Sequence, residues 1–419
     1  MLNWLQRFNT FSFLDNHAYS SGLSTQEVLV GAGVRHSLDL TVAEGPEAFV
    51  QLDNFVQSHK GSWIFGHLGY DFASPSSHRF NESTAGKGFG DICFFVPEII
   101  IRFNDNRMII LAPDPQIVFD EIRETEIVSG NRQIAGKPLI RSRLTKEKYI
   151  NTIDQLRQHI LRGDCYEINF CQEFFAEQAV IDPVTTYERL TRLSPAPFAG
   201  FYRVRDQWLL CASPERYLKK LGNKIYSQPI KGTLKRNSSD PVTDLRRSGE
   251  LYNSGKDRSE NVMIVDLVRN DFSRFCKEGT VRVEELYGIY TFPQVYQMIS
   301  TISGELPDNV TFAEIIKASF PMGSMTGAPK KRVMELIRQY EFNARGLFSG
   351  TVGYISPEGD FDFNVVIRSI LYDQSARYLS LPAGSGITFY SDPAQEWEEC
   401  MVKAAAMRAV FESEDPLGK

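Results

Sequence analysis

Short apolar runs separated by turn-forming residues dominate the first part of the chain. The runs SWIFGHLGYDF and DICFFVPEIIIRFNDNRMIILA predict strands, because glycine, asparagine and aspartate bound and interrupt them. Residues 103–108 predict a hairpin tip between two of these strands. A polar, basic and glycine-bearing stretch at 130–145 follows. We expect it to separate an N-terminal region, 1–140, from a second region, 141–412, which a short tail at 413–419 follows.

The second region mixes helical and extended patterns. Apolar residues at helical spacing between Tyr149 and Ile160, with Gly163 after them, predict a helix over 145–162. Further helices are predicted over 257–276, 327–342 and 393–411, and strands over 166–174, 200–213 and 215–232, the last with a hairpin turn at Gly222-Asn223. Residues 360–373 alternate and predict one more strand. Because helices and strands do not alternate regularly, we predict an α+β sandwich of mainly antiparallel sheets with helices outside.

Composition narrows the class of protein. The chain has 419 residues, 42% of them hydrophobic and 23% charged, as in soluble globular enzymes. Its 46 Lys and Arg against 52 Asp and Glu give a net charge of −6, with no basic block that would indicate nucleic-acid binding. No apolar stretch approaches the roughly 20 residues that span a membrane, and no signal peptide is evident. Six scattered cysteines without metal-binding spacing indicate reduced thiols, so we expect a cytoplasmic protein.

Three glutamates on predicted helices are candidate ligands for a hard cation. Glu396, Glu399 and Lys403 lie at i, i+3 and i+7 of the last helix and share one face. Two carboxylates on one face can bind Mg²⁺, although a solvated charged face has the same pattern. Glu260 lies near the start of the helix predicted over 257–276. It is either a partner of the helix dipole or a ligand that points into a cavity.

Two basic residues are candidates for substrate chemistry. Arg368 follows an apolar run inside the protein, where a guanidinium needs a carboxylate partner, either Asp362 or a substrate. Lys231 stands before Gly232 in PIKGT, and a lysine kept neutral by burial or by cationic neighbours becomes a nucleophile. Most lysines are instead solvated, so neither residue is decisive by itself.

Seven motifs in a fixed order add more specific information. They are SPERY (213–217), PIKGT (229–233), ENVMIVDLVRND (260–271), GSMTGAPKKRVMELI (323–337), FSGTVGYIS (348–356), FNVVIRSI (363–370) and SDPAQEWEECMVKA (391–404). This series resembles the chorismate-utilising enzymes, which include the component I chains of anthranilate synthase and aminodeoxychorismate synthase and the isochorismate and salicylate synthases. The resemblance is dense over 145–412 and loose before it.

The resemblance implies a fold, a cofactor and a set of roles. The fold is that of anthranilate synthase component I, and Mg²⁺ is the cofactor, held by Glu260, Glu396 and Glu399 against the ring carboxylate of chorismate. Glu215 matches the general acid that protonates the departing C4 hydroxyl, which requires a raised pKa. The residues that match substrate-binding positions are Gly232, Thr233, Arg368, Gly384, Ser385, Gly386 and Lys403.

Lys231 distinguishes between members of the family. Anthranilate synthases usually have alanine in this motif, whereas one large group of aminodeoxychorismate synthases has lysine, which is thought to attack C2 before ammonia enters at C4. The resemblance therefore favours synthesis of 4-amino-4-deoxychorismate for p-aminobenzoate and folate, through a covalent Lys231 intermediate. Anthranilate synthesis is the alternative, and a paralogue that binds chorismate without converting it is a third. Isochorismate and salicylate synthases have a lysine where this chain has Glu167.

Other positions bear on the pocket and on the nitrogen source. Gln297 stands where many relatives have histidine, and Phe348 replaces a frequent tyrosine. None of the six cysteines lies in a glutaminase signature. We therefore expect this chain to use free ammonia alone and glutamine only with a separate amidotransferase subunit, component II.

Overall fold

The computed structural model describes residues 1–19, 23, 27–41, 47–73, 88–104, 107–126, 137–237 and 239–412. Residues 105 and 106 of the predicted hairpin tip, the first part of the proposed boundary stretch and the tail at 413–419 lie outside the described residues. The two strands beside that tip pair as predicted, with Asn104 opposite Arg107. None of the helices in the described part is long and apolar enough to cross a membrane.

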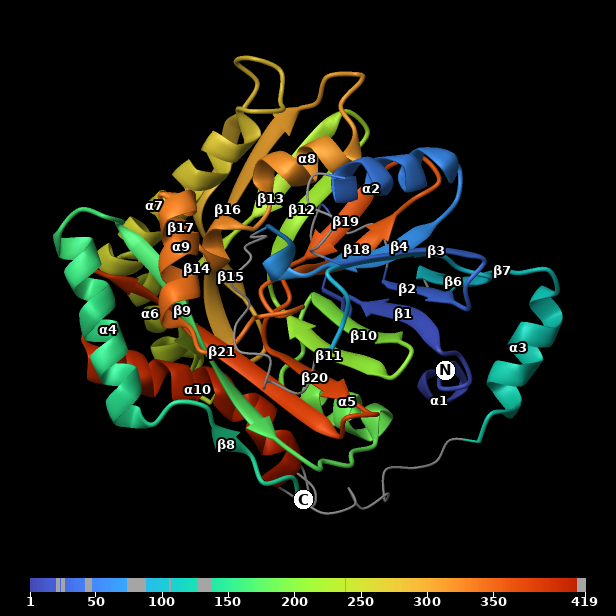
Figure 1. Ribbon diagram of the computed structural model, residues 1–419, viewed down its shortest axis with the longest axis horizontal. Coiled ribbons are helices and arrows are strands. Elements are labelled where there is room, and N and C mark those ends of the chain that lie inside the picture. The colour runs from blue at the N-terminus through green and yellow to red at the C-terminus, as the bar shows by residue number, and fades with distance from the viewer. Residues whose placement is uncertain are drawn as a thin grey trace.

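Two antiparallel sheets form the centre of the described structure (Figure 1). The eleven-stranded sheet runs in the order β17 (Gly327–Ala328), β9 (Glu167–Ala176), β21 (Tyr378–Thr388), β20 (Ser369–Asp373), β11 (Gln207–Ser213), β10 (Phe198–Val204), β1 (Thr10–Asp15), β2 (Val28–Ala32), β6 (Ile99–Asn104) and β7 (Arg107–Leu111), with β8 (Arg141–Ser142) beside β9. The ten-stranded sheet runs in the order β14 (Ile230–Lys235), β16 (Val295–Glu305), β13 (Lys224–Gln228), β12 (Arg216–Leu221), β19 (Phe361–Asn364), β18 (Thr351–Ile355), β4 (Ile64–Leu68), β5 (Ile92–Val96) and β3 (His36–Leu40), with β15 (Arg282–Thr291) beside β16.

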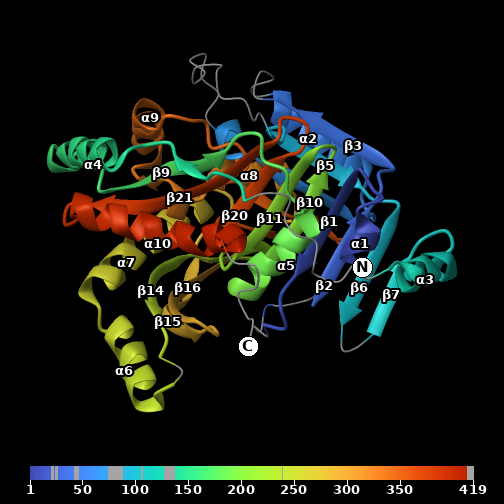
Figure 2. The ribbon, with the colours of Figure 1, turned by 90° about the horizontal axis from the view of Figure 1, so that it is seen from below.

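The helices cover the outer faces of the sheets (Figures 1 and 2). One hydrophobic core joins the eleven-stranded sheet to α4, α5, α9 and α10, and a second joins the other sheet to α2, α7 and α8. A third core, with Phe65, Phe95, Tyr202 and Leu209, lies between the sheets. The described helices are α1 (Leu2–Leu5), α2 (Glu47–Ser58), α3 (Pro115–Glu124), α4 (Lys146–Leu161), α5 (Pro183–Leu193), α6 (Pro241–Tyr252), α7 (Gly255–Phe272), α8 (Phe312–Ser319), α9 (Lys330–Tyr340) and α10 (Pro393–Glu412). The predicted α+β sandwich is therefore confirmed.

Strands from the beginning of the chain pair with strands from its second region in both sheets. In the eleven-stranded sheet, β1 pairs with β10, and in the ten-stranded sheet β4 pairs with β18. The first 140 residues thus complete two sheets whose other strands come much later. These pairings do not test whether the regions 1–140 and 141–412 fold separately, so that division stays a prediction.

Two predicted strands are each two strands in the structure. Residues 200–213 form the antiparallel pair β10 and β11. Residues 360–373 form two strands, β19 and β20, which belong to different sheets. Between them, the chain crosses from one sheet to the other, and Arg368 has a positive φ of 49° there. Alternation of side chains cannot continue through such a crossing, because the two strands face different layers. The direction of the Arg368 side chain therefore does not follow from the strand pattern.

A buried ion pair connects α9 to the end of the eleven-stranded sheet. The guanidinium of Arg345 donates to Glu341 at 2.6 and 2.9 Å, to the carbonyl of Met325 at 2.6 Å and to that of Asn169 at 2.7 Å. The side chains of Arg345 and Glu341 are only 2% and 3% exposed. The pair therefore fixes the segment around Met325 against β9.

We expect Arg345→Met to lower the free energy of unfolding by about 3–5 kcal/mol, because it leaves the Glu341 carboxylate buried without its cation. Chemical denaturation measures this loss. The matched control is Arg246→Met, which removes an exposed i,i+4 pair with Glu250 and should cost less than about 1 kcal/mol. Equal losses in the two variants would contradict the structural role of Arg345.

Candidate active site

The candidate site lies where the chain crosses between the two sheets. Glu215 occupies the crossing from β11 to β12, and Arg368 ends the crossing from β19 to β20. The two crossings are hydrogen-bonded to each other. The backbone N–H of Val365 donates to the carbonyl of Glu215 at 3.0 Å, and the hydroxyl of Ser213 donates to the carbonyl of Val365 at 2.5 Å. The local fold thus places Glu215 beside the segment that carries Arg368.

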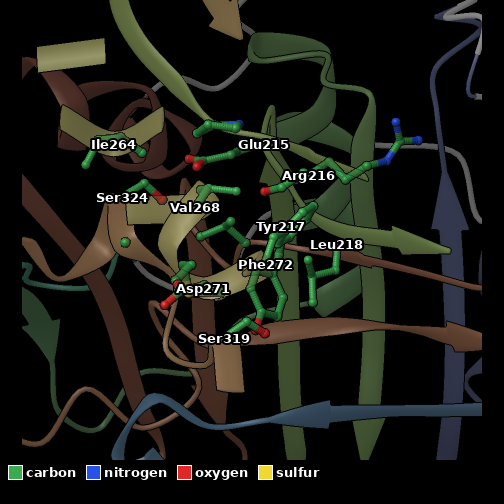
Figure 3. A pocket seen from close by; sticks show the side chains of 15 residues that line it. Glu215, Arg216, Tyr217, Leu218, Ile264, Val268, Asp271, Phe272, Ser319 and Ser324 are labelled. Atoms are coloured by element: carbon green, nitrogen blue, oxygen red, sulfur yellow. The ribbon is translucent and has the colours of Figure 1, made fainter. Parts of the chain in front are cut away.

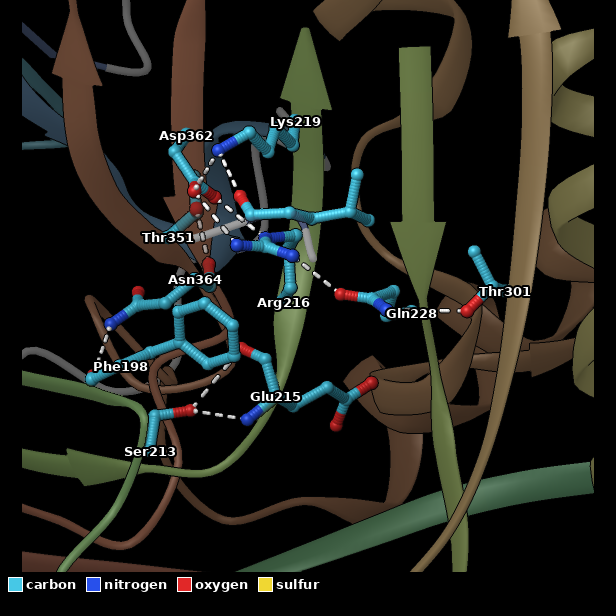
Figure 4. A network of polar contacts seen from close by, with 11 residues as sticks. Phe198, Ser213, Glu215, Arg216, Lys219, Gln228, Thr301, Thr351, Asp362 and Asn364 are labelled. Carbon is cyan, nitrogen blue, oxygen red and sulfur yellow. Dashed lines mark hydrogen bonds and ion pairs between the residues drawn. The ribbon is translucent and has the colours of Figure 1, made fainter. Parts of the chain in front are cut away.

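Adjacent residues at this crossing point in opposite directions (Figure 4). Arg216 donates to Asp362 at 2.8 and 2.9 Å, and Lys219 lies 3.3 Å from the same carboxylate. Glu215 points away from that network. Asp362 thus pairs with Arg216 and Lys219. Within the described residues, Arg368 forms no ion pair with Asp362 or with another carboxylate, so Asp362 is not its partner.

Glu215 has the properties of a proton donor near neutral pH. Glu215 is only 4% exposed, and burial raises the pKa of its carboxyl to about 7. A hydrogen bond from Ser324 and the positive charges of Lys231 and Arg368 oppose this rise. Glu215 and Ser324 also line a cavity of about 20 Å³, large enough for one water molecule (Figure 3). A carboxyl with this pKa is partly protonated at neutral pH, as a general acid requires.

Ser324 was not predicted as a site residue. It lies in a short 3₁₀ turn, Gly323–Met325, which leads into β17. There Gly327 has φ of +137°, and a Cβ on it would lie 2.0 Å from the carbonyl oxygen of Glu167. Only glycine permits this approach, and the approach sets the position of the Ser324 turn. Ser324 belongs to the quoted motif GSMTGAPK, but only the structure places this serine beside Glu215.

Lys231 forms a buried ion pair with Glu167. Lys231 comes from β14 in one sheet and Glu167 from β9 in the other, and Lys231 Nζ donates to Glu167 Oε1. Their side chains are 11% and 2% exposed. Burial by itself would lower the pKa of Lys231, but the carboxylates of Glu167, Glu260 and Glu215 raise it above the ordinary value. The raised pKa favours a protonated Lys231 in the free protein, whereas a nucleophile requires the neutral amine.

Gly384, Ser385 and Gly386 lie in the interior of β21. Gly384 pairs with Cys171 and Gly386 with Asn169, both on β9. A Cβ on Gly386 would lie 2.8 Å from Lys231 Nζ and 2.9 Å from Glu167 Oε1. Gly386 therefore leaves room for the ion pair. Ser385 lies on the opposite face of the strand, where its hydroxyl is 3.1 Å from that of Tyr149.

Two of the three candidate metal ligands have a buried carboxylate oxygen that accepts no hydrogen bond among the described residues. Glu260 is the sixth residue of α7, beyond its first turn, and burial raises the pKa of its carboxyl to about 7. Glu396 lies in the first turn of α10, is 3% exposed and also has a pKa raised by burial. One oxygen of each is buried and has no hydrogen-bond partner among the described residues. Such oxygens suit a hard divalent cation.

Glu399 differs from these two. Its side chain is 44% exposed and lies 2.8 Å from Lys403, which also donates to the carbonyl of Gly384 at 3.1 Å. Burial would raise the pKa of Glu399, but the charges of Lys403, Lys256 and Lys231 lower it. In the part of the chain that the structure describes, no three His, Cys, Asp or Glu residues are already grouped as a metal site. The three glutamates thus offer suitable oxygens without a preformed cluster.

The remaining predicted residues lie on β14 and its neighbours. Gly232 has φ of +90°, and a Cβ on it would lie 3.0 Å from Asp257 of α7, so glycine permits the close contact between strand and helix. Thr233 is exposed and pairs with Gln297 of β16. Gln297 is 1% exposed, and its Oε1 has no partner among the described residues. Phe348 is buried in the core.

Comparisons with known proteins agree on one family. A family model described as chorismate binding enzyme matches residues 15–409. Aminodeoxychorismate synthase component 1 of Salmonella typhimurium is 40% identical over 262 residues, which are 62% of this chain and 57% of that protein. Anthranilate synthase alpha subunit 1, chloroplastic, of Arabidopsis thaliana is 34% identical over 307 residues, 68% of this chain and 51% of that protein. The chain thus spans little more than half the length of these relatives.

A solved structure confirms the fold expected from the resemblance. Anthranilate synthase component I from Streptococcus pneumoniae superposes with a TM-score of 0.81 over 93% of this chain and 94% of that one, at 23% sequence identity. At this identity, the similarity establishes the fold alone.

Proposed function

Because this chain belongs to the chorismate-binding enzymes, we propose that it converts chorismate and ammonia to 4-amino-4-deoxychorismate, the reaction of an aminodeoxychorismate synthase component I. The observation that carries this proposal is the position of Lys231. Its amine lies in a buried site with Glu215, a carboxyl whose pKa is about 7. The identity to aminodeoxychorismate synthase component 1 of Salmonella typhimurium also supports it.

In the proposed reaction, Lys231 is the nucleophile and Glu215 is the acid. The lone pair of Nζ forms a bond to C2 of chorismate, the ring double bond shifts, and the bond from C4 to its hydroxyl oxygen breaks. Glu215 gives that oxygen its proton, so that water leaves. Ammonia then attacks C4, the double bond shifts back, and the C2–N bond breaks with its electron pair returning to Lys231. Covalent catalysis in this way divides one difficult substitution into two steps.

Positively charged groups around Lys231 suit an anionic ring substrate. The guanidinium of Arg368 has no ion-pair partner among the described residues and suits the carboxylate of the enolpyruvyl group. Gly386 leaves the space beside Lys231 unfilled, because a Cβ there would lie 2.8 Å from Lys231 Nζ. Lys403 adds a second positive charge at the edge of the site.

We further propose that Glu260, Glu396 and Glu399 hold Mg²⁺. A bound Mg²⁺ would neutralise the ring carboxylate of chorismate and fix the ring in the site. The buried oxygens of Glu260 and Glu396 that accept no hydrogen bond among the described residues support this proposal. Glu399 would have to exchange its contact with Lys403 for the cation.

For Glu399→Gln, we expect the Mg²⁺ concentration at half-maximal activity to rise by about 10- to 100-fold, because a charged oxygen ligand becomes a neutral amide. Activity measured across a Mg²⁺ titration gives this value. Glu398→Gln is the matched control, since Glu398 is an exposed neighbour paired with Lys146. An unchanged Mg²⁺ dependence in Glu399→Gln would contradict the assignment.

We propose that a separate amidotransferase subunit supplies ammonia from glutamine. A glutaminase nucleophile is a thiolate, and burial raises the pKa of each of the six cysteine thiols of this chain. None of them pairs in a disulfide, which also favours a cytoplasmic location. If this chain alone released glutamate from glutamine, the inference would be wrong.

Mass spectrometry of the product tests the proposed function. The chain is incubated with chorismate, Mg²⁺ and ammonium, and we expect a product that keeps the enolpyruvyl group and that added aminodeoxychorismate lyase converts to p-aminobenzoate. Fluorescent anthranilate together with free pyruvate would instead identify an anthranilate synthase, the function of the Arabidopsis relative. Absence of any turnover at high ammonium would contradict both.

A further inference from the structure

Glu167 has no role in the reaction described so far, although it contacts the proposed nucleophile directly. Lys231 Nζ donates to Glu167 Oε1, and both side chains are almost fully buried. Lys231 therefore carries a proton before the reaction, and an ammonium has no lone pair with which to attack carbon. A group in the site has to take this proton.

The other carboxylates that face Lys231 have partners of their own. Glu215 on the β11–β12 crossing accepts a hydrogen bond from Ser324, Glu260 on α7 lies 3.9 Å from Lys256, and Glu399 on α10 pairs with Lys403. Within the described residues, the ion pair with Lys231 is the one side-chain contact that stabilises the charge of Glu167.

Among the described residues, no other hydrogen-bond donor competes with Lys231 for the side chain of Glu167. Its second oxygen, Oε2, is buried and has no hydrogen-bond partner among the described residues. When substrate excludes water from the site, transfer of the proton within the pair replaces two opposite buried charges by two neutral groups.

The backbone of β21 opposite the pair leaves the Lys231 amine and the Glu167 carboxylate in direct contact. Gly386 lies against both groups, and even a single Cβ there would lie 2.8 Å from Lys231 Nζ and 2.9 Å from Glu167 Oε1. No side chain from β21 therefore comes between the amine and the carboxylate, and a proton can pass directly from one to the other.

We propose that Glu167 accepts the proton that Lys231 must lose before it attacks chorismate, an inference that rests on the function proposed above. The Nζ–H bond of Lys231 breaks, an O–H bond forms at Glu167 Oε1, and the freed lone pair of Nζ forms the bond to C2. When ammonia displaces the lysine, Lys231 leaves as a neutral amine. The proton then returns from Glu167 to Nζ, which restores the ion pair for the next turnover.

Two measurements on Glu167→Gln test the proposal. The first uses the free protein: limiting acetic anhydride acetylates neutral amines, and peptide mass spectrometry compares Lys231 with exposed Lys235 of the same strand. At about pH 9, we expect Lys231 to react at least about tenfold faster in Glu167→Gln than in the wild type, because its ammonium has lost its counter-charge. Glu177→Gln, which removes an exposed pair with Arg141 just beyond β9, should leave the ratio unchanged.

The second measurement follows the covalent adduct of chorismate on Lys231 by rapid quench and intact-protein mass spectrometry, with Mg²⁺ and without ammonium. In the wild type, we expect the rate of adduct formation to vary little with pH on its acid side, since the proton stays inside the site. In Glu167→Gln, the rate should fall by about 100-fold near pH 6.5 and recover towards about pH 9, where solvent removes the proton.

The outcomes distinguish a failure of the proton-transfer proposal from a failure of the proposed covalent function. Unchanged acetylation of Lys231 in Glu167→Gln would overturn the ion pair and with it the role of Glu167. An adduct rate lowered equally at every pH would show a purely structural residue and would also overturn it. If acetylation changes as expected but the wild type forms no adduct, the proposed covalent function fails, and the proton transfer fails with it.

Discussion

Replacement of Lys231 by alanine is expected to lower the rate of 4-amino-4-deoxychorismate formation by at least about 1,000-fold, because it removes the nucleophile of the proposed first step. The turnover number at saturating chorismate and ammonium measures the loss. Removal of Lys231 also leaves Glu167 buried without a cation, so the variant is expected to be less stable. Lys231→Arg separates these effects, because a guanidinium can keep the ion pair but cannot act as a nucleophile.

We expect Lys231→Arg to be folded, by thermal denaturation, and as inactive as Lys231→Ala. Lys235→Ala is the matched control on the same strand and should keep the wild-type rate. Near wild-type formation of 4-amino-4-deoxychorismate in folded Lys231→Arg would contradict covalent catalysis. Formation of anthranilate by Lys231→Ala would instead mean that the lysine selects between the two aminations.

The second large effect is expected for Glu215→Gln, which should lower turnover by about 10²- to 10⁴-fold because the C4 oxygen then leaves without a proton. A glutamine side chain has nearly the same size and can keep the hydrogen bond with Ser324. The loss should therefore appear in turnover, while the affinity for chorismate, measured by equilibrium binding, changes little. A comparable weakening of binding would assign Glu215 to substrate recognition instead.

The pKa of Glu215 also predicts the direction of the pH dependence. Because the acid works only while protonated and its pKa is about 7, turnover should decline as the pH rises through about 7. Ser324→Ala removes a hydrogen bond that lowers this pKa, so the decline should move to higher pH. Rates measured from about pH 6 to 9 at saturating Mg²⁺ test both statements. A shift to lower pH in Ser324→Ala would contradict the proposed contact.

Local patterns predicted four of the described helices, α4, α7, α9 and α10, and many of the strands, because local physics determines these elements. The helix α4 follows from buried residues such as Tyr149 and Ile153 at helical spacing, with Thr145 as its N-terminal cap. The turn at Gly222-Asn223 follows equally from a hairpin in which Leu221 pairs with Lys224. Residues 360–373 misled the same reasoning, because alternation in β19 and β20 is the same whether the two strands share a sheet or not.

The candidate site was predictable only in part, for a related reason. Sequence motifs identified Glu215, Lys231 and Glu260, since each lies in a distinctive run. The ion pair of Lys231 with Glu167 joins residues 64 positions apart on two different sheets, and no local pattern indicates such a contact. The pKa of Lys231 depends on that contact, because burial alone would lower it and the neighbouring carboxylates raise it.

The pairing of early with late strands has a consequence for how the chain acquires its structure. During synthesis, β4 emerges long before its partner β18, and β1 emerges long before β10. Until then, these strands expose unpaired edges, and closing such long loops is entropically costly and slow. We therefore expect refolding from denaturant to be slow and to depend on protein concentration, with aggregation of early intermediates. Chaperones that shield strand edges should raise the yield more than slower synthesis does.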